Sequence, residues 1–292
     1  PSSGTNQTPV GVVGPTKGNQ LVNPPNTGPQ TAKATIQEQL SKRLKGRVTS
    51  AELISAVLES KYSYSHMMEE FARNAKKYGT KGGLPSSMVL AKSHHGMWEV
   101  RNANTAGMGY KEVVASPTKA DWERALFETV ANSLIQQWAG TSNDTNARAL
   151  ALQLAAKEEF GLADTYDWPM NPGLKADTDW ELNKHRNLYR TFLRVMYENT
   201  QEWAKANGVK SVRLRRGSGT YAGPVGSIAN AKLRPMSSFS TNYSTAAGFG
   251  SNRIEAYVPI EWVIGNAATG YGCQNEFEWV VLGGTHKVRV IK

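Results

Sequence analysis

Residues 273–284 read CQNEFEWVVLGG, and the apolar run within them predicts a buried β-strand. Two glutamates, Glu276 and Glu278, stand two positions apart at the start of that run. Because side chains alternate along a strand, both carboxylates are expected on one face of it. Unpaired carboxylates are costly beside an apolar strand, so the pair is expected to have a chemical task.

Further strands are predicted around this one, in the last third of the chain. They are alternating or β-branched segments separated by Gly, Asn and Ser, at residues 211–216, 237–241, 254–260, 278–282 and 287–291. The preceding part of the chain, from about residue 33 to 207, has helical periodicity. Helices followed by strands favour an α+β fold over an alternating βαβ fold.

Three helix starts are predicted where a threonine precedes an acidic residue by three positions, at Thr49, Thr118 and Thr178. Apolar side chains then recur at helical spacing and are expected in the core. They are Trp122, Leu126, Val130, Leu134 and Trp138 after the second start, and Leu188, Phe192, Val195, Met196 and Trp203 after the third. The pair Asn207-Gly208 predicts the end of the last helix.

Composition divides the chain into three predicted parts. Residues 1–31 hold six of the thirteen prolines and one charge, which is typical of a flexible linker. Residues 32–208 form a mainly helical lobe, and residues 209–292 form a β-rich core. No apolar run approaches the ~18 residues needed to cross a bilayer, so no membrane partner is expected.

The net charge is 34 minus 24, or +10, and it is unevenly placed. No Asp or Glu occurs from Trp203 to Ile254, a segment with eight cations. These are Lys205, Lys210, Arg213, Arg215, Arg216, Lys232, Arg234 and Arg253. The segment is a candidate site for a phosphate-bearing ligand, although charge alone favours a solvated basic surface or a nucleic-acid patch.

Several common site types are excluded because their sequence motifs are absent or have the wrong residue spacing. The glycines after Arg216 follow GxGxxxG with Pro224 next, which does not fit a dinucleotide-binding fingerprint. No P-loop and no nucleophile elbow occur. The single cysteine excludes an internal disulfide, and the five histidines show no metal-ligand spacing, so no metal is expected.

Three stretches taken together resemble a known family. An arginine that ends a strand and precedes Gly217 is followed by Phe239-Ser240-Thr241 and then by Glu276-Phe-Glu278 before an apolar strand. This ordered set resembles the mono-ADP-ribosyltransferases of the arginine-serine-glutamate class, which include toxins, injected effectors and phage enzymes. The resemblance covers residues 209–292 and implies two packed β-sheets around an NAD cleft, with an N-terminal helical lobe.

The resemblance implies that NAD is a co-substrate bound by an arginine and a serine. Arg216 matches the family arginine, with Arg215 as the alternative because the doublet leaves the register open. We prefer Arg216 because Gly217 follows it and because it shares a strand face with Val212 and Leu214. The implied NAD contacts are Arg216, Gly217, Ser240, Thr241, Phe249 and Arg253, with Asn252 as the alternative to Arg253.

The resemblance also assigns separate tasks to the two glutamates. Glu278 is expected to contact the nicotinamide ribose and stabilise the oxocarbenium-like state as nicotinamide leaves. Glu276 is expected to orient or deprotonate the acceptor. The alternative register pairs Gln274 with Glu276.

Glu at the first of these positions goes with arginine acceptors in the family. Residues 265–275 match the acceptor-recognition loop, in which Tyr271 is the only aromatic residue. The expected acceptor is therefore an arginine on a macromolecule, in first place a host or target-cell protein. Two alternatives remain open: a basic nucleic-acid-binding module, and a transferase whose acceptor is nucleic acid. The sequence leaves localisation open.

Overall fold

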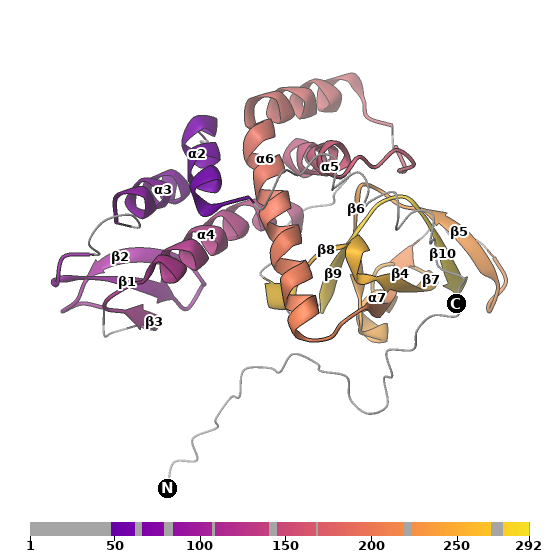
Figure 1. Cartoon of the computed structure of the whole chain (residues 1–292). Helices are drawn as coiled ribbons and strands as arrows, with labels where there is room; N and C mark the ends of the chain where they lie inside the picture. Colours follow the sequence, from indigo (N-terminus) through magenta and orange to yellow (C-terminus); the bar gives the residue numbers. More distant parts are fainter. Residues whose placement is uncertain are drawn as a thin grey trace, which may run out of the picture.

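The computed structural model describes residues 48–61, 66–78, 84–106, 109–139, 145–167, 169–218, 223–269 and 277–291. In these residues the protein is a mixed α+β structure with six helices and two antiparallel sheets, so the predicted α+β class is confirmed at that level (Figure 1). The helices are α2 (Ser50–Ser60), α3 (His66–Tyr78), α4 (Lys119–Ala139), α5 (Ala147–Phe160), α6 (Pro172–Ala206) and α7 (Tyr243–Ala247).

Two of the three predicted helix starts are confirmed. Thr49 and Glu52 form a reciprocal capping box at α2, and the backbone N–H of Asp121 donates to the Thr118 hydroxyl oxygen at α4. The third is wrong, because α6 begins at Pro172 and Thr178 is buried within it. Asn171 caps this helix by accepting from the Leu174 N–H at 2.8 Å. An Asn-Pro start was thus the stronger signal.

The expected apolar stripes form the helical core. The side chains that are buried as predicted are Trp122, Leu126, Val130, Leu134, Leu188, Phe192 and Met196. Trp138 lies outside the described side chains. Helix α6 ends at Ala206 with Asn207 as its cap, as the Asn-Gly pair predicted. None of the described helices is both long enough and apolar enough to span a bilayer.

A three-stranded antiparallel sheet interrupts the lobe that the sequence predicted to be mainly helical. Its order is β2-β1-β3, from β1 (Met88–Ser93), β2 (Trp98–Asn102) and β3 (Tyr110–Val114). Leu90 and Trp98 of this small sheet are fully buried and belong to the same core as the helices. Its strands are only five or six residues long and include Lys, Glu, Arg and Asn, which weakens the β signal in the sequence.

The seven-stranded antiparallel sheet follows α6 and has the order β5-β10-β7-β4-β6-β9-β8. Its strands are β4 (Ser211–Ser218), β5 (Ile228–Lys232), β6 (Met236–Ser240), β7 (Asn252–Pro259), β8 (Val263–Asn266), β9 (Glu278–Leu282) and β10 (Thr285–Val290). Five of these match predicted strands, whereas β5 and β8 were missed. In the described residues these strands form one hydrogen-bonded sheet, so the expected pair of packed sheets around an NAD cleft is not confirmed.

The sheet is nevertheless divided in the middle. Strand β4 pairs with β7 along its whole length, but β4 and β6 share a single register pair, Arg215↔Ser240. The two strands therefore part on either side of this point. Helix α6 stands between the small sheet and the seven-stranded sheet (Figure 1), and the Thr200 hydroxyl donates to the Ile264 carbonyl at 2.9 Å.

Candidate active site

A row of polar side chains crosses the middle of the seven-stranded sheet, where β4, β6 and β9 lie side by side. Arg215 is the register partner of Ser240, and Ser240 is the register partner of Glu278. Directly opposite residues share a face, with Cβ atoms ~4.5–5.5 Å apart. The fold thus brings an arginine, a serine and a glutamate from three strands to one face.

Glu278 is 4 % exposed and Ser240 is 5 % exposed, so the carboxylate needs partners within the protein. The Ser238 hydroxyl donates to Glu278 Oε1. The Ser240 hydroxyl oxygen accepts from the Asn242 backbone N–H at 3.0 Å. Sequence reasoning missed Ser238, although its spacing of two residues from Ser240 on one strand placed both hydroxyls on the same face.

Arg215 is held from both sides of the row. Its Nε lies 3.0 Å from Glu255 Oε2 on β7, and its Nη1 donates to the Thr241 carbonyl oxygen at 2.9 Å. Glu255 is 8 % exposed and also pairs with Arg213 at 2.8 Å. The hydrogen bond from Arg213 to Glu255 raises the pKa of the Arg213 guanidinium. The Glu255 carboxylate thus holds Arg213 and Arg215 beside the row.

The preference for Arg216 over Arg215 is not supported by this arrangement. Arg216 points to the opposite face, where its guanidinium lies 5.9 Å from the Phe239 ring centre. Its Nη1 donates to the Ser238 carbonyl oxygen at 2.5 Å across the gap between β4 and β6. The face that Arg216 shares with Leu214 is the core face, since Leu214 is fully buried. Arg215 therefore takes the position beside Ser240.

Gly217 allows the α7 segment to lie directly on β4. A Cβ atom at Gly217 would lie 2.2 Å from the Ala246 carbonyl oxygen and 3.0 Å from the Gly250 backbone nitrogen. Asn242 starts this segment by accepting from the Ser244 N–H at 2.8 Å. A side chain at position 217 would displace the loop, so only glycine allows this close packing.

Two other predicted NAD contacts lie near the row. Arg253 is the register partner of Gly217, so it shares the face of Arg215. Its Nη1 donates to the Tyr243 hydroxyl oxygen at 2.5 Å. Phe249 is 60 % exposed on the segment that covers Gly217. Asn252, the alternative to Arg253, is the first residue of β7.

The acceptor side of the predicted site lies largely outside the described residues, which include neither Tyr271 nor Glu276. Gly265 belongs to β8 rather than to a loop. Phe277 has φ +50°, and β9 begins only at Glu278. The prediction that Glu276 and Glu278 lie on one strand face therefore stays a prediction, because Glu276 lies outside the described residues.

Arg215, Ser240 and Glu278 line neither of two cavities, of about 990 and 540 Å³, elsewhere in the protein. In the described part of the chain, no group of three or more His, Cys, Asp or Glu side chains is placed to hold a metal ion. The chain matches no protein-family model, no curated protein and no solved structure.

Proposed function

We propose that the protein is an NAD-dependent mono-ADP-ribosyltransferase that transfers ADP-ribose to an arginine of a protein acceptor and releases nicotinamide. The observation that carries the proposal is the row of Arg215, Ser240 and Glu278 on one face of three adjacent strands. An arginine, a hydroxyl and a carboxylate in that order are the groups that bind a phosphate, orient a ribose and stabilise a positive charge.

In the proposed reaction the bond between the ribose C1′ and the nicotinamide nitrogen breaks, and nicotinamide leaves with the electron pair. Positive charge then develops on the ribose, and the Glu278 carboxylate stabilises it. Ser238 holds that carboxylate by its hydrogen bond to Oε1, so Ser238 is a positioning residue. A nitrogen of the acceptor forms the new bond to C1′ and gives up its proton to a base, for which Glu276 is proposed.

Arg215 is proposed to bind the NAD phosphates. Its side chain is 18 % exposed, and its guanidinium already contacts one carboxylate and one carbonyl. The planar guanidinium has five N–H donors, so Arg215 can keep these two contacts and also donate to a phosphate. Arg253, on the same face, is proposed as the second cation for the pyrophosphate.

The nucleic-acid alternative is weakened by what the basic segment contacts. Arg213 and Arg215 pair with Glu255, and Lys232 pairs with Asp164 at 2.9 Å. Arg216 bonds a backbone carbonyl, and Arg253 bonds a tyrosine. At least five of the eight cations thus have partners within the protein, so fewer are left to contact a continuous phosphate backbone.

The proposal is tested by measuring nicotinamide release from NAD, with and without a cell lysate as the source of acceptor. The parent protein should release nicotinamide in both conditions and label a protein in the lysate. Glu276→Gln should stop labelling while slow hydrolysis by water continues, whereas Glu278→Gln should stop both. Absence of any NAD cleavage by the folded parent protein, with lysate present, would overturn the proposal.

A further inference from the structure

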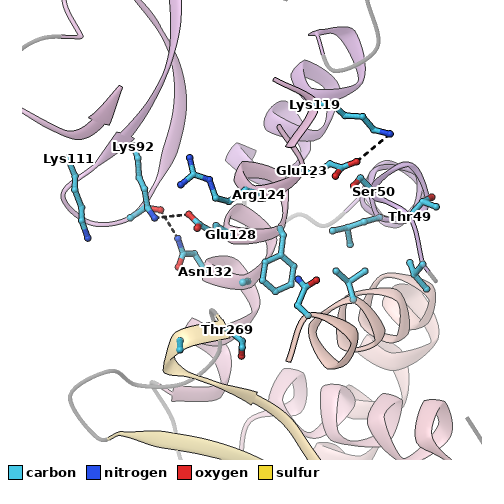
Figure 2. Close-up of a pocket in the computed structure, with 18 of the residues that line it drawn as sticks. Thr49, Ser50, Lys92, Lys111, Lys119, Glu123, Arg124, Glu128, Asn132 and Thr269 are labelled. Atoms are coloured by element: carbon cyan, nitrogen blue, oxygen red, sulfur yellow. Dashed lines mark hydrogen bonds and ion pairs between the residues drawn. The ribbon is translucent and has the colours of Figure 1, made fainter. Parts of the chain in front are cut away.

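A cavity of about 990 Å³ lies where the N-terminal lobe meets one end of the seven-stranded sheet (Figure 2). We call it the interlobe groove, and its lining includes Lys92, Lys111, Lys119, Glu128, Asn132 and Thr269. Lys92 and Lys111 come from the small sheet, the next three from α4, and Thr269 from the short 3₁₀ helix η2 (Ala267–Thr269). A volume of this size is at the upper end of the range for binding sites.

The floor of the groove adjoins the end of the sheet that carries Glu278. Asn266, the last residue of β8, is the register partner of Trp279, the residue that follows Glu278. Helix η2 follows Asn266 at once, and Asn266 Oδ1 accepts from the Ala268 and Thr269 N–H groups at 2.8 and 3.1 Å. The groove therefore ends at the β8 edge of the sheet, one residue along β9 from Glu278.

The opposite wall of the groove is fixed by hydrogen bonds between the small sheet and α4. Glu128 Oε2 accepts from the Trp98 indole N–H at 2.7 Å and pairs with Lys92 at 2.7 Å. The Asn132 amide donates to the Gly96 carbonyl oxygen at 2.8 Å, which holds the β1–β2 turn on α4. The wall is thus formed before any partner binds, which reduces the entropy cost of binding.

The groove has an excess of positive charge. Its lining contains four lysines and arginines, Lys92, Lys111, Lys119 and Arg124, against Glu123 and Glu128, a difference of +2. The Lys119 to Glu123 pair is long, at 3.7 Å, and Lys119 is 81 % exposed (Figure 2). Exposed pairs of this kind contribute ~0–1 kcal/mol, so a partner carboxylate can replace Glu123.

Lys111 is the most available of these cations. It is exposed on β3, an edge strand of the small sheet, and within the described residues it forms no ion pair. His94 and His95, on the β1–β2 turn, are exposed at the same rim. These groups are free to meet the anionic side chains of a partner.

We propose that the interlobe groove docks an acidic segment of the acceptor protein, next to the residue that is modified. The assignment of this partner as the acceptor rests on the proposed function. A protein partner is favoured over nucleic acid because the described lining has no exposed Phe, Tyr or Trp ring for stacking, since Phe127 is buried. Glu123 and Glu128 would also repel a continuous phosphate backbone, whereas carboxylates spaced along a protein segment can avoid them.

The docking is tested by the fluorescence anisotropy of a labelled peptide of alternating glutamate and glycine residues mixed with the full chain. The double variant Lys111→Glu/Lys119→Glu should bind it about tenfold more weakly than the parent protein, and added salt should weaken the parent's binding. Glutamate at position 119 is compatible with the first turn of α4, so the variant is expected to fold. The control is Lys175→Glu/Lys287→Glu, which makes the same charge change on exposed residues outside the groove.

The outcomes separate the groove from the catalytic proposal. Equal binding by the groove variant and the control would overturn the docking. So would a labelled single-stranded DNA that binds the parent more tightly than the peptide and loses affinity in the same variant. If the peptide binds in the groove but the parent never cleaves NAD, the docking stands and the proposed function falls. If the parent cleaves NAD but its peptide binding does not depend on the groove, the proposed function stands and the docking falls.

Discussion

The two faces of the seven-stranded sheet are built from the same strands but contain opposite chemistry. On one face Arg215 contacts Glu255, and Ser238 contacts Glu278, so polar groups meet polar groups. On the other face Leu214 and Ile254 are fully buried in the core. Adjacent residues of one strand therefore belong to different environments, and a shift of one position in the register changes the chemistry that a sequence predicts.

The largest effect is expected on the polar face, from Glu278→Gln. It removes the charge that is proposed to stabilise the transition state, which typically costs ~2.7–4 kcal/mol, on the order of a hundred- to thousandfold in rate. Steady-state nicotinamide release measures the effect. The fold should remain, because the amide has the shape of the carboxyl group and can still accept from Ser238. A rate within a fewfold of the parent would remove Glu278 from the proposed chemistry.

On the core face, the buried His286 should make the free energy of unfolding depend on pH under acid conditions. Burial lowers the pKa of this histidine from 6.5 to about 4, against the opposing effect of its contact with the Leu282 carbonyl oxygen. The folded protein therefore holds it neutral, while the unfolded chain binds a proton below pH ~6.5. The associated stability is present above that pH and is lost as the pH falls to about 4, up to about 3 kcal/mol.

Urea unfolding at a series of pH values measures this loss. His286→Gln cannot take up the proton, so its free energy of unfolding should fall less between pH 6.5 and 4 than that of the parent protein. His185, whose pKa burial also lowers to about 4, is present in both proteins and cancels in the comparison. Parallel curves for the two proteins would show that His286 titrates as it does in the unfolded chain.

Gly217→Ala tests the close approach of the α7 segment to the polar face. The new Cβ would lie 2.2 Å from the Ala246 carbonyl oxygen, so the backbone must move, at a cost of ~1–3 kcal/mol. Both the thermal midpoint and the rate of nicotinamide release should fall. Gly173→Ala is the matched control, because it has ordinary contacts at the start of α6 and should be neutral. Equal behaviour of the two variants would contradict the packing of α7 on β4.

The paired variants Arg215→Lys and Arg216→Lys compare the two faces directly. Lysine at position 215 cannot hold both Glu255 and the Thr241 carbonyl, and bonds to charged groups contribute ~1.5–3 kcal/mol. The kcat/KM for NAD should therefore fall about tenfold or more. Arg216→Lys loses one carbonyl bond and a ring contact and should change kcat/KM only a fewfold. The opposite ranking would restore Arg216 as the arginine that serves NAD.

The sequence predicted local structure better than the site. Thr49, Thr118 and the Asn207-Gly208 pair are recognisable because capping depends on residues close in the chain. The choice between Arg215 and Arg216 depends on which face of β4 is covered by the core, and that is a property of the assembled sheet. Ser238 was missed for the same reason, since its partner Glu278 lies forty positions away and becomes a neighbour only through the β6–β9 register.

The smallest expected effect concerns Phe277, which separates the two glutamates. Its φ of +50° lies in the left-handed region, which costs a bulky residue ~1–2 kcal/mol. Phe277→Gly removes that strain but adds entropy to the unfolded chain and loses a side chain that is 38 % exposed. A net gain of no more than about 1 kcal/mol in the free energy of unfolding is expected.

A set of substitutions at this position is more informative than one. If the left-handed turn is present, stability should fall in the order Phe277→Gly, Phe277→Asn, Phe277→Val, because Asn tolerates this conformation and a β-branched residue does not. If Val is as stable as Gly, the backbone at Phe277 is extended. Glu276 would then lie on the face of Glu278, because residues two positions apart in an extended strand share a face. The ranking, measured by urea unfolding, therefore decides whether the donor and acceptor carboxylates are held by one strand or separated by a turn.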